Sequence, residues 1–238
     1  MNQQRIQQLK ILADTLDIEG IDLALLNQAL THPSYGMEQA MADNQRLEFL
    51  GVAVIELVMG EYVYHLFPHD DEGKLTKMRA SLVCEESLAH AALQLGLNKY
   101  ILLGHGEAAS GGAMRSSNLA DAWEAVCGAI YLSCGVDVLK PMAVKYLEDS
   151  IERVKGGYYG DYKTRLQEYI QQEPNHEISY ELIEEIGPAH DRDFHIQVCV
   201  DGKACGDGWG KSKKIAQREA ALAALIAFGE IPMMEVRK

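Results

Sequence analysis

Several features that would each indicate a class of protein are missing from this sequence of 238 residues. It contains no uninterrupted run of about 18 apolar residues, so we expect no transmembrane helix and no membrane partner. The first residues, MNQQRIQQLK, lack the apolar stretch of a secretory signal peptide, and we expect none. The five cysteines form no CxxC pair, which disfavours a disulfide framework and a structural zinc site. Reduced thiols in a cytoplasmic protein are the expectation.

Positive charge is also scarce. The chain has 22 Lys and Arg against 35 Asp and Glu, a formal net charge of −13. Such a chain repels nucleic acid at long range, so a nucleic-acid function needs a local basic patch or bound metal cations. Hydrophobic residues make up 47% of the sequence, which excludes wholesale disorder and predicts a folded core.

Helical spacing dominates the first two thirds of the chain. Between residues 44 and 67 the apolar side chains recur three or four positions apart, and Asn44 stands where an N-cap would. Further helices are predicted within 5–30, with Asp22 as a cap, and over 74–97, 118–134 and 138–154. Residues 104–112, GHGEAASGG, predict a glycine-rich loop. The expectation is an all-α domain over residues 1–154.

The pattern changes after a glycine-rich segment, KGGYYGD, which predicts a linker at 155–160. A short helix is expected at 162–172, followed by alternating strands at 178–187 and 193–202 with a hairpin turn at Asp201-Gly202. A third strand over 203–209 and an Ala-rich helix over 212–228 complete an α-β-β-β-α unit. We therefore predict a second, small α+β domain over 161–229 and a tail over 230–238.

Three carboxylates stand among apolar neighbours on predicted helices. Glu48 lies within the helix that follows Asn44, and Asp121 and Glu124 are three residues apart on a later helix. Carboxylates on apolar faces are costly unless they are paired or bound to a cation, and oxygen ligands suit Mg²⁺ or Mn²⁺. The alternative is that they lie on solvated edges or pair with arginines, for which the candidates are Arg46, Arg79 and Arg115.

The residues around these acids closely resemble bacterial ribonuclease III. NQRLEFLG at 44–51 is similar to that family's signature, commonly N-[EQ]-R-L-E-F-L-G-D. The resemblance continues through THPSY (31–35), DEGKLTKMRASLV (71–83), GHGEAASGG (104–112) and LADAWEAVCGAIYL (119–132). The second unit resembles a double-stranded-RNA-binding domain through DYKTRLQEY (161–169), GPAHDRDF (187–194) and GWGKSKKIAQREAA (208–221).

The resemblance implies a homodimeric, Mg²⁺-dependent endoribonuclease that processes double-stranded RNA, such as rRNA and mRNA precursors. It leaves 5′-phosphate and 3′-hydroxyl ends. Glu48, Asp121 and Glu124 match the metal-binding acids, and Glu124 is the expected catalytic carboxylate. One departure stands out, because Val52 occupies the position of a catalytic aspartate after LEFLG. Valine offers no oxygen ligand, so the chain is expected to cleave RNA poorly. The alternative function is a dimer that binds duplex RNA without cutting it.

RNA-binding residues in the second unit are likewise implied by the resemblance. The unit has eight Lys and Arg against twelve Asp and Glu, so its basic residues are local. Lysines in the KSKK segment would meet phosphates at the start of the last helix, where the helix dipole assists, and the first helix and a following loop would contact the minor groove. The expected RNA-binding residues are Thr164, Gln167, Glu168, His190, Lys211, Lys213 and Lys214. Without this context KSKK would be interpreted as a solvated lysine run.

Two other patterns are set aside. GDGWGKS at 206–212 imitates a phosphate-binding loop, but Cys205 stands where that motif needs its first glycine, so no nucleotide cofactor is expected. Trp123 is interpreted as a core residue, and His32 and His65 as packed or surface groups.

Overall fold

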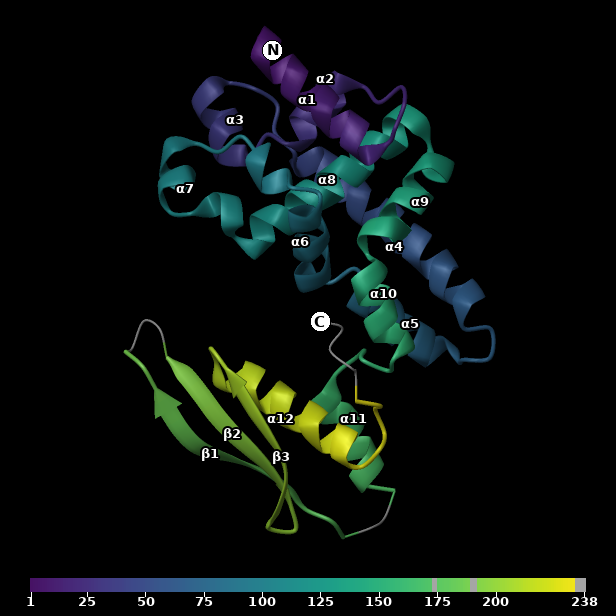
Figure 1. Ribbon diagram of the computed structural model, residues 1–238, viewed down its shortest axis with the longest axis vertical. Helices are drawn as coiled ribbons and strands as arrows, with labels where there is room; N and C mark the ends of the chain where they lie inside the picture. The colour runs from purple at the N-terminus through teal and green to yellow at the C-terminus, as the bar shows by residue number, and fades with distance from the viewer. Residues whose placement is uncertain (173–174, 189–191, 234–238) are drawn as a thin grey trace. The chain divides into compact units, whose positions relative to one another are not determined.

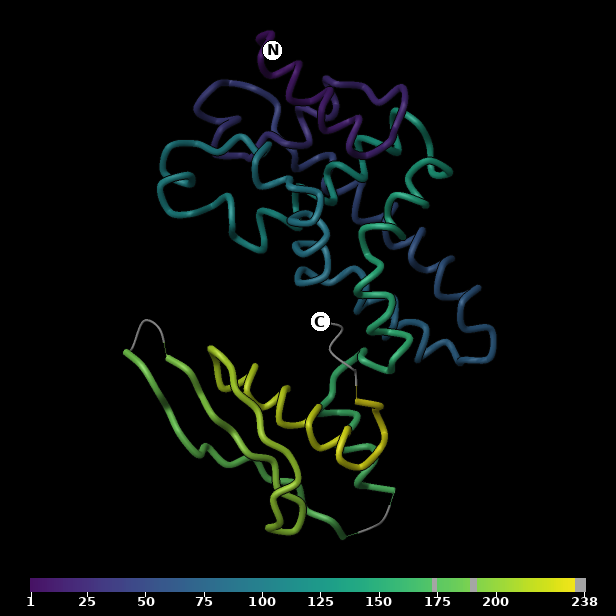
Figure 2. Tube along the Cα trace, viewed as in Figure 1, coloured from purple at the N-terminus to yellow at the C-terminus, as the bar shows by residue number. Residues whose placement is uncertain are grey.

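The computed structural model describes residues 1–172, 175–188 and 192–233. The chain divides into two compact units, Met1–Glu152 and Arg153–Lys238 (Figures 1 and 2). The first unit is built from helices and the second from a sheet with two helices, which is the architecture expected from the sequence.

The helices of the first unit follow the predicted order, with some of the predicted segments divided. The break between the fifth and sixth helices falls at Val83-Cys84, inside the predicted 74–97 helix, and Leu147 divides the predicted 138–154 helix. Helix α10 runs across the boundary between the units. The helices are α1 (Gln3–Leu16), α2 (Leu23–Ala29), α3 (Pro33–Gln39), α4 (Gln45–Leu66), α5 (Glu72–Leu82), α6 (Glu85–Gln94), α7 (His105–Ala109), α8 (Ser116–Cys134), α9 (Val136–Tyr146) and α10 (Glu148–Lys155).

Helix α8 forms the centre of this unit. It is buried along most of its length, with Trp123 fully buried as predicted for a core residue. Helix α4 lies against α8 at very short range, because Gly51 of α4 faces the α8 backbone and Gly128 of α8 faces the α4 backbone. Any side chain at these two positions would overlap backbone atoms of the other helix. The two glycines therefore set how closely the helices approach.

Pro33 is the first residue of α3, a position where proline is well tolerated. Two local predictions differ from the structure. The glycine-rich 104–112 segment contains the short helix α7. Asn44 makes no side-chain capping bond to α4; it is buried, and its backbone N–H donates to Thr31 O at 2.9 Å. Asp22, by contrast, caps α2 as predicted.

Helix α4 is long and apolar enough to cross a membrane, but core helices of globular domains can have the same length and composition. Its packing along α8 and its charged residues, which include Arg46 and Glu48, fit a core helix.

The second unit has the α-β-β-β-α order. Its elements are α11 (Tyr162–Ile170), β1 (Ile178–Ile186), β2 (Asp193–Val200), β3 (Lys203–Gly210) and α12 (Lys213–Ala227). The antiparallel sheet has the order β1-β2-β3, and both helices cover one of its faces (Figure 1). Ile196 and Val198 of β2 point into the core beneath the helices. Gly206 and Gly208 of β3 let α12 approach the sheet, since a Cβ at either would overlap its backbone.

The core of this unit extends beyond the predicted domain limits of 161–229. Tyr158, placed in the predicted linker, and Ile231, placed in the predicted tail, are both buried in it. The Tyr158 hydroxyl donates to Pro232 O at 2.6 Å, and Arg165 donates to Glu230 O at 2.8 Å. The ends of the unit are thus held together by residues that the sequence pattern assigned to flexible segments.

Candidate metal centre and RNA-binding face

The α4–α8 crossing brings together the three carboxylates singled out in the sequence. Oxygens of Glu48, Asp121 and Glu124 all lie within 4.8 Å of one another, and each side chain is half-buried. Glu48 lies in the first turn of α4, one turn before Gly51. Asp121 and Glu124 lie one turn apart on α8. The helices approach closely at Gly51 and Gly128, so carboxylates from segments more than 70 residues apart in the chain converge.

The pKa values of all three acids are raised. Burial, followed by the charges of Asp121 and Glu48, raises the pKa of Glu124 to about 7. Burial and the neighbouring Asp121 and Asp43 raise the pKa of Glu48. Burial also raises the pKa of Asp121, against an opposing effect from His32. Burial and mutual repulsion disfavour the ionised form of these carboxylates, and a bound cation would compensate for both effects.

Two of the three arginines considered as partners for these acids pair with other carboxylates. Arg79 pairs with Glu56 at 3.4 Å, and Arg115 pairs with Glu107. Among residues 1–172, 175–188 and 192–233, no lysine or arginine forms an ion pair with the three clustered acids. The donor set is therefore three oxygen ligands without a protein counter-ion, which fits Mg²⁺ or Mn²⁺.

Val52 lies one turn after Glu48 on α4 and is 39% exposed. Its side chain contributes an apolar surface where an aspartate would add a fourth carboxylate. Glu56, one turn further, is engaged with Arg79 and does not belong to the carboxylate cluster. Among the described residues, the carboxylate cluster at this crossing consists of Glu48, Asp121 and Glu124.

His32 is a neighbour of this centre that the sequence pattern did not connect with it. It precedes α3, and its Nδ1 accepts a hydrogen bond from the Ser34 backbone N–H at 3.2 Å. Its charge lowers the pKa of Asp121, in opposition to burial. The link between Thr31 O and the Asn44 N–H explains the proximity, because it ties the 31–32 segment to the start of α4.

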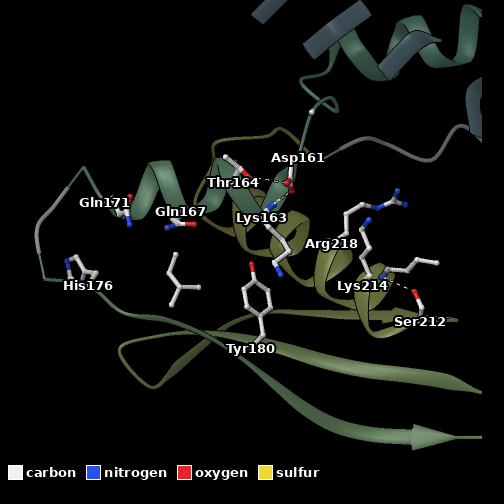
Figure 3. Close-up of a pocket in the computed structure, with 13 residues that line it drawn as sticks. Asp161, Lys163, Thr164, Gln167, Gln171, His176, Tyr180, Ser212, Lys214 and Arg218 are labelled. Carbon is white, nitrogen blue, oxygen red and sulfur yellow. Dashed lines mark hydrogen bonds between the residues drawn. The ribbon is translucent and has the colours of Figure 1, made fainter. Parts of the chain in front are cut away.

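The second unit carries a groove of about 1090 Å³ between α11, β1 and the start of α12 (Figure 3). Three of the predicted RNA-binding residues line it, namely Thr164 and Gln167 from α11 and Lys214 from α12. Ser212 caps α12 at the rim of the groove by accepting from the Ile215 N–H at 3.2 Å. The helix N-terminus and the polar α11 residues thus face the same space.

The other predicted RNA-binding residues are placed differently. Lys211 pairs with Asp193 at 3.0 Å, and Lys213 pairs with Glu185 at 3.2 Å, both outside the groove lining. Glu168 lies on α11 but does not line the groove. His190 falls outside the described residues. Exposed pairs of this kind are weak, so two lysines of KSKK are held near acids that a phosphate can displace.

Two cations in the groove were not identified from the sequence. Lys163 of α11 lies 4.7 Å from the Tyr180 ring centroid (Figure 3). It also donates to Gln217 Oε1 at 2.8 Å. Arg218 lies one turn after Lys214 on α12 and lines the same groove. The signal that could have found Arg218 is its spacing of four from Lys214, which places both on one helix face.

Comparison with known proteins accounts for both units. The family model described as "Ribonuclease-III-like" matches residues 22–150, and the double-stranded RNA binding motif matches residues 162–227. Ribonuclease 3 of Syntrophomonas wolfei is 48% identical over 198 residues, covering 83% of this chain and 85% of that protein. Ribonuclease 3 of Moorella thermoacetica is 42% identical over 226 residues, covering 94% of this chain and 97% of that protein. The chain belongs to the ribonuclease III family.

A solved structure agrees with this assignment. The nuclease domain of ribonuclease III from Campylobacter jejuni is 44% identical, with a TM-score of 0.55, and the match covers 58% of this chain and 95% of that one. In that domain the region involved in dimer formation shows structural flexibility. The family confirms the predicted fold, a helical ribonuclease III domain followed by a double-stranded-RNA-binding domain. As a ribonuclease III, the protein is an endoribonuclease of double-stranded RNA.

Proposed function

We propose that this ribonuclease III is a divalent-metal-dependent enzyme whose own cleavage step is impaired by Val52. The observation that carries the proposal is the convergence of Glu48, Asp121 and Glu124 within 4.8 Å at the α4–α8 crossing. Ligand oxygens on one Mg²⁺ lie about 3–4 Å apart, so small side-chain rotations would bring these carboxylates to a shared ion.

Glu48, Asp121 and Glu124 would hold Mg²⁺, with Mn²⁺ as a substitute. The ion would supply an activated water and would neutralise charge on the scissile phosphate. The protein's part is to hold three ionised carboxylates in a half-buried site, and Glu124, with its pKa raised to about 7, is the acid that must give up a proton before the site is fully charged. The expected products carry 5′-phosphate and 3′-hydroxyl ends.

Val52 removes one carboxylate from this arrangement. An apolar side chain can neither bind the ion nor accept a hydrogen bond from its water, so the attacking water is held less firmly. The same substitution removes a negative charge from beside Glu48, which reduces repulsion in the folded protein. We therefore propose a site that folds well and turns over slowly.

The exposed side of α4 supports a homodimer through the nuclease domain. Phe49 is 81% exposed, and Leu57 and Tyr64 are each 65% exposed, all on this helix. Large apolar side chains at such exposure favour burial against a partner. The Campylobacter jejuni nuclease domain has a region involved in dimer formation, which adds support by analogy.

Duplex RNA would bind to the second unit through the predicted set, Thr164, Gln167, Glu168, His190, Lys211, Lys213 and Lys214. Lys163 and Arg218 would extend the basic surface inside the groove. We propose residues 155–160 as the segment that links the two activities, with its Tyr158 packed in the core of the second unit. We further propose that the enzyme acts in the cytoplasm, on precursors of rRNA and mRNA.

Val52 also favours a second candidate function, a dimer that binds duplex RNA and does not cut it. The two candidates are separated by incubating a long duplex RNA with Mg²⁺ and this chain, beside its Val52→Asp version. Slow cleavage with 5′-phosphate ends, stopped by EDTA, would support the enzyme. Tight binding with no cleavage by this chain, alongside cleavage by Val52→Asp, would support the binding protein. Cleavage that persists in EDTA would contradict metal dependence.

A further inference from the structure

The sheet of the second unit has one face that its helices leave uncovered (Figure 1). Ile196 and Val198 point into the core, so the residues on either side of them in β2 point to the opposite face. On that face His195 and Gln197 lie beside residues of β1 and β3 that the strand register places next to them. The groove lined by Thr164, Gln167 and Lys214 is on the helix side, so this outer face is separate from the proposed RNA-binding face.

Two rows of side chains run across the outer face. In the first row, Glu184 is opposite His195, which is opposite Trp209. In the second row, the partners are Glu181, Gln197 and Asp207.

An aromatic pair stands in the first row. The rings of His195 and Trp209 stack with centroids 4.4 Å apart and an interplanar angle of 5°. Asp207 ties the rows together, since its Oδ1 lies 3.2 Å from His195 Nε2 and accepts from Gln197 Nε2 at 3.1 Å. Trp209 is nevertheless 47% exposed. The stack therefore presents an ordered indole to solvent.

The charge on these rows has one sign. They contain three carboxylates, those of Glu181, Glu184 and Asp207, and no lysine or arginine. All three acidic residues are exposed. Phosphates would be repelled here, whereas a guanidinium group can stack on the indole and pair with the adjacent carboxylates. An indole flanked by carboxylates thus complements an arginine side chain in both shape and charge.

We propose that this outer sheet face binds an arginine-rich segment of a partner protein. Arginines of the segment would stack on Trp209 and pair with Glu181, Glu184 and Asp207. The indole is already held in place by His195, so little conformational freedom is lost on binding. The site does not depend on the carboxylate centre or on the RNA groove.

The test uses the full chain and a short peptide of alternating arginine and glycine residues. Trp209 serves as the reporter, because the other tryptophan, Trp123, is fully buried. We expect saturable quenching or a spectral shift of Trp209 fluorescence. We also expect affinity at least several-fold higher than for the matched lysine–glycine peptide, since guanidinium stacks on indole better than ammonium does.

Variants identify the face. The combined change Glu181→Gln, Glu184→Gln and Asp207→Asn should weaken binding of the labelled peptide by at least about tenfold, because three charged partners of the peptide are neutralised. Trp209→Leu should weaken it several-fold by fluorescence anisotropy. The matched control removes as many exposed acids from the nuclease domain, and its affinity should equal that of the unaltered chain. Its changes are Asp14→Asn, Glu19→Gln and Glu148→Gln.

The Glu181, Glu184 and Asp207 variant should bind duplex RNA at least as tightly as the unaltered chain does, because this face is separate from the groove. Unchanged peptide affinity in the Glu181, Glu184 and Asp207 variant would overturn the proposal, because the peptide would then be held elsewhere on the acidic chain. A loss of duplex RNA affinity in the same variant would also overturn it and assign the face to RNA. These substitutions are exposed and nearly isosteric. If circular dichroism nevertheless shows unfolding, Glu184→Gln alone decides, since neutralising one arginine partner should still lower affinity measurably.

Discussion

Gly51 of α4 lies directly against the backbone carbonyl of Glu124 on α8, so a Cβ at position 51 would overlap that oxygen. Gly128 stands in the same relation to the Leu47 carbonyl of α4. Glu48 and Asp121 each lie about one helical turn from this contact, and the backbone of Glu124 is part of it. The packing of two helix backbones, set by glycine, therefore determines how close the carboxylates come.

Replacing Gly51 with alanine should destabilise the nuclease domain by at least about 2 kcal/mol, because the helices must separate or bend. The matched control is Gly60→Ala on the same helix, where the added Cβ would meet Arg79 Cδ at an ordinary 3.7 Å. That change should be neutral or stabilising by about 0.5–1 kcal/mol through helix propensity. Urea unfolding of both variants measures the difference. Equal stabilities would show that the crossing is not limited by this contact.

Introducing a carboxylate at position 52 is the most direct test of the proposed active centre. Val52→Asp should raise cleavage of long duplex RNA in Mg²⁺ by at least about 10²-fold, or roughly 2.7 kcal/mol of barrier. The physical reason is that an added oxygen can orient the metal-bound water. Val52→Asn serves as the control, since it matches the volume of aspartate without its charge and should recover much less. Equal rates for valine and aspartate would refute our interpretation of position 52.

Glu124 should be indispensable once cleavage is restored. In the Val52→Asp background, Glu124→Gln keeps the side-chain volume but loses the charge that holds the ion, so turnover should fall below detection. Duplex RNA affinity, measured in parallel in Ca²⁺ or without metal, should change by less than about twofold because Glu124 lies outside the RNA-binding unit. Persistent cleavage would show that Glu124 is not a metal ligand.

The carboxylate cluster should make the metal-free protein pH-sensitive. The folded-state pKa of Glu124 is raised to about 7, so the folded protein holds this proton more tightly than the unfolded chain does. This tighter proton binding stabilises the folded protein. The stabilisation is fully present below the ordinary carboxyl pKa and is lost as the pH rises through about 7. Allowing for solvent screening of a half-exposed group, we expect a decrease of about 1–2 kcal/mol.

Thermal unfolding in EDTA between acidic and mildly alkaline pH measures this effect. Glu124→Gln should flatten the dependence, because the amide does not titrate. Mg²⁺ competes with the proton, so its stabilising effect should grow over the same pH interval. Two results together would contradict the shared protonation of the cluster. The stability of the metal-free protein would rise with pH across this interval, and Glu124→Gln would leave that pH dependence unchanged.

The sequence predicted elements well where one local signal dominated. Apolar spacing located α4, the Asp201-Gly202 pair located the β2–β3 turn, and Asp22 marked the start of α2. Prediction failed where a distant contact decides the structure. Tyr158 follows glycine and lies in a linker-like composition, yet it is buried because Ile231 and Pro232 return to cover it.

The carboxylate site was likewise predicted in part from local sequence signals, and the rest of it depends on distant contacts. The acids could be identified as unusual by their apolar surroundings, but spacing along the chain left open whether they pair with arginines. Only the α4–α8 contact decides this, by bringing Glu48 to Glu124 while Arg79 and Arg115 engage other acids. The two exposed rows on the sheet depend on strand register across a bulge in each strand pair, and a one-residue error in register would send their side chains to the opposite face.

Lysines of the KSKK segment provide the last prediction. Lys211 and Lys213 are paired with Asp193 and Glu185, and Lys214 lines the groove. Replacing all three with alanine should weaken binding to any duplex RNA about equally, since phosphate contacts carry no sequence information. For each phosphate that the variant no longer neutralises, the slope of log K against log salt should become shallower by about 0.9. The stability of the domain should change by less than about 1 kcal/mol, because the two ion pairs are exposed.

Titration against two unrelated duplexes at several salt concentrations measures both effects. The matched control removes three exposed lysines from the nuclease domain, through Lys10→Ala, Lys99→Ala and Lys145→Ala, and should leave the slope nearly unchanged. The dimer should persist in both variants, because its proposed surface is on α4. If the KSKK variant keeps the original slope, then Asp193 and Glu185 outcompete phosphate for these lysines. The RNA contacts would then have to come from the groove itself, where Lys163 and Arg218 are the remaining cations among the described lining residues.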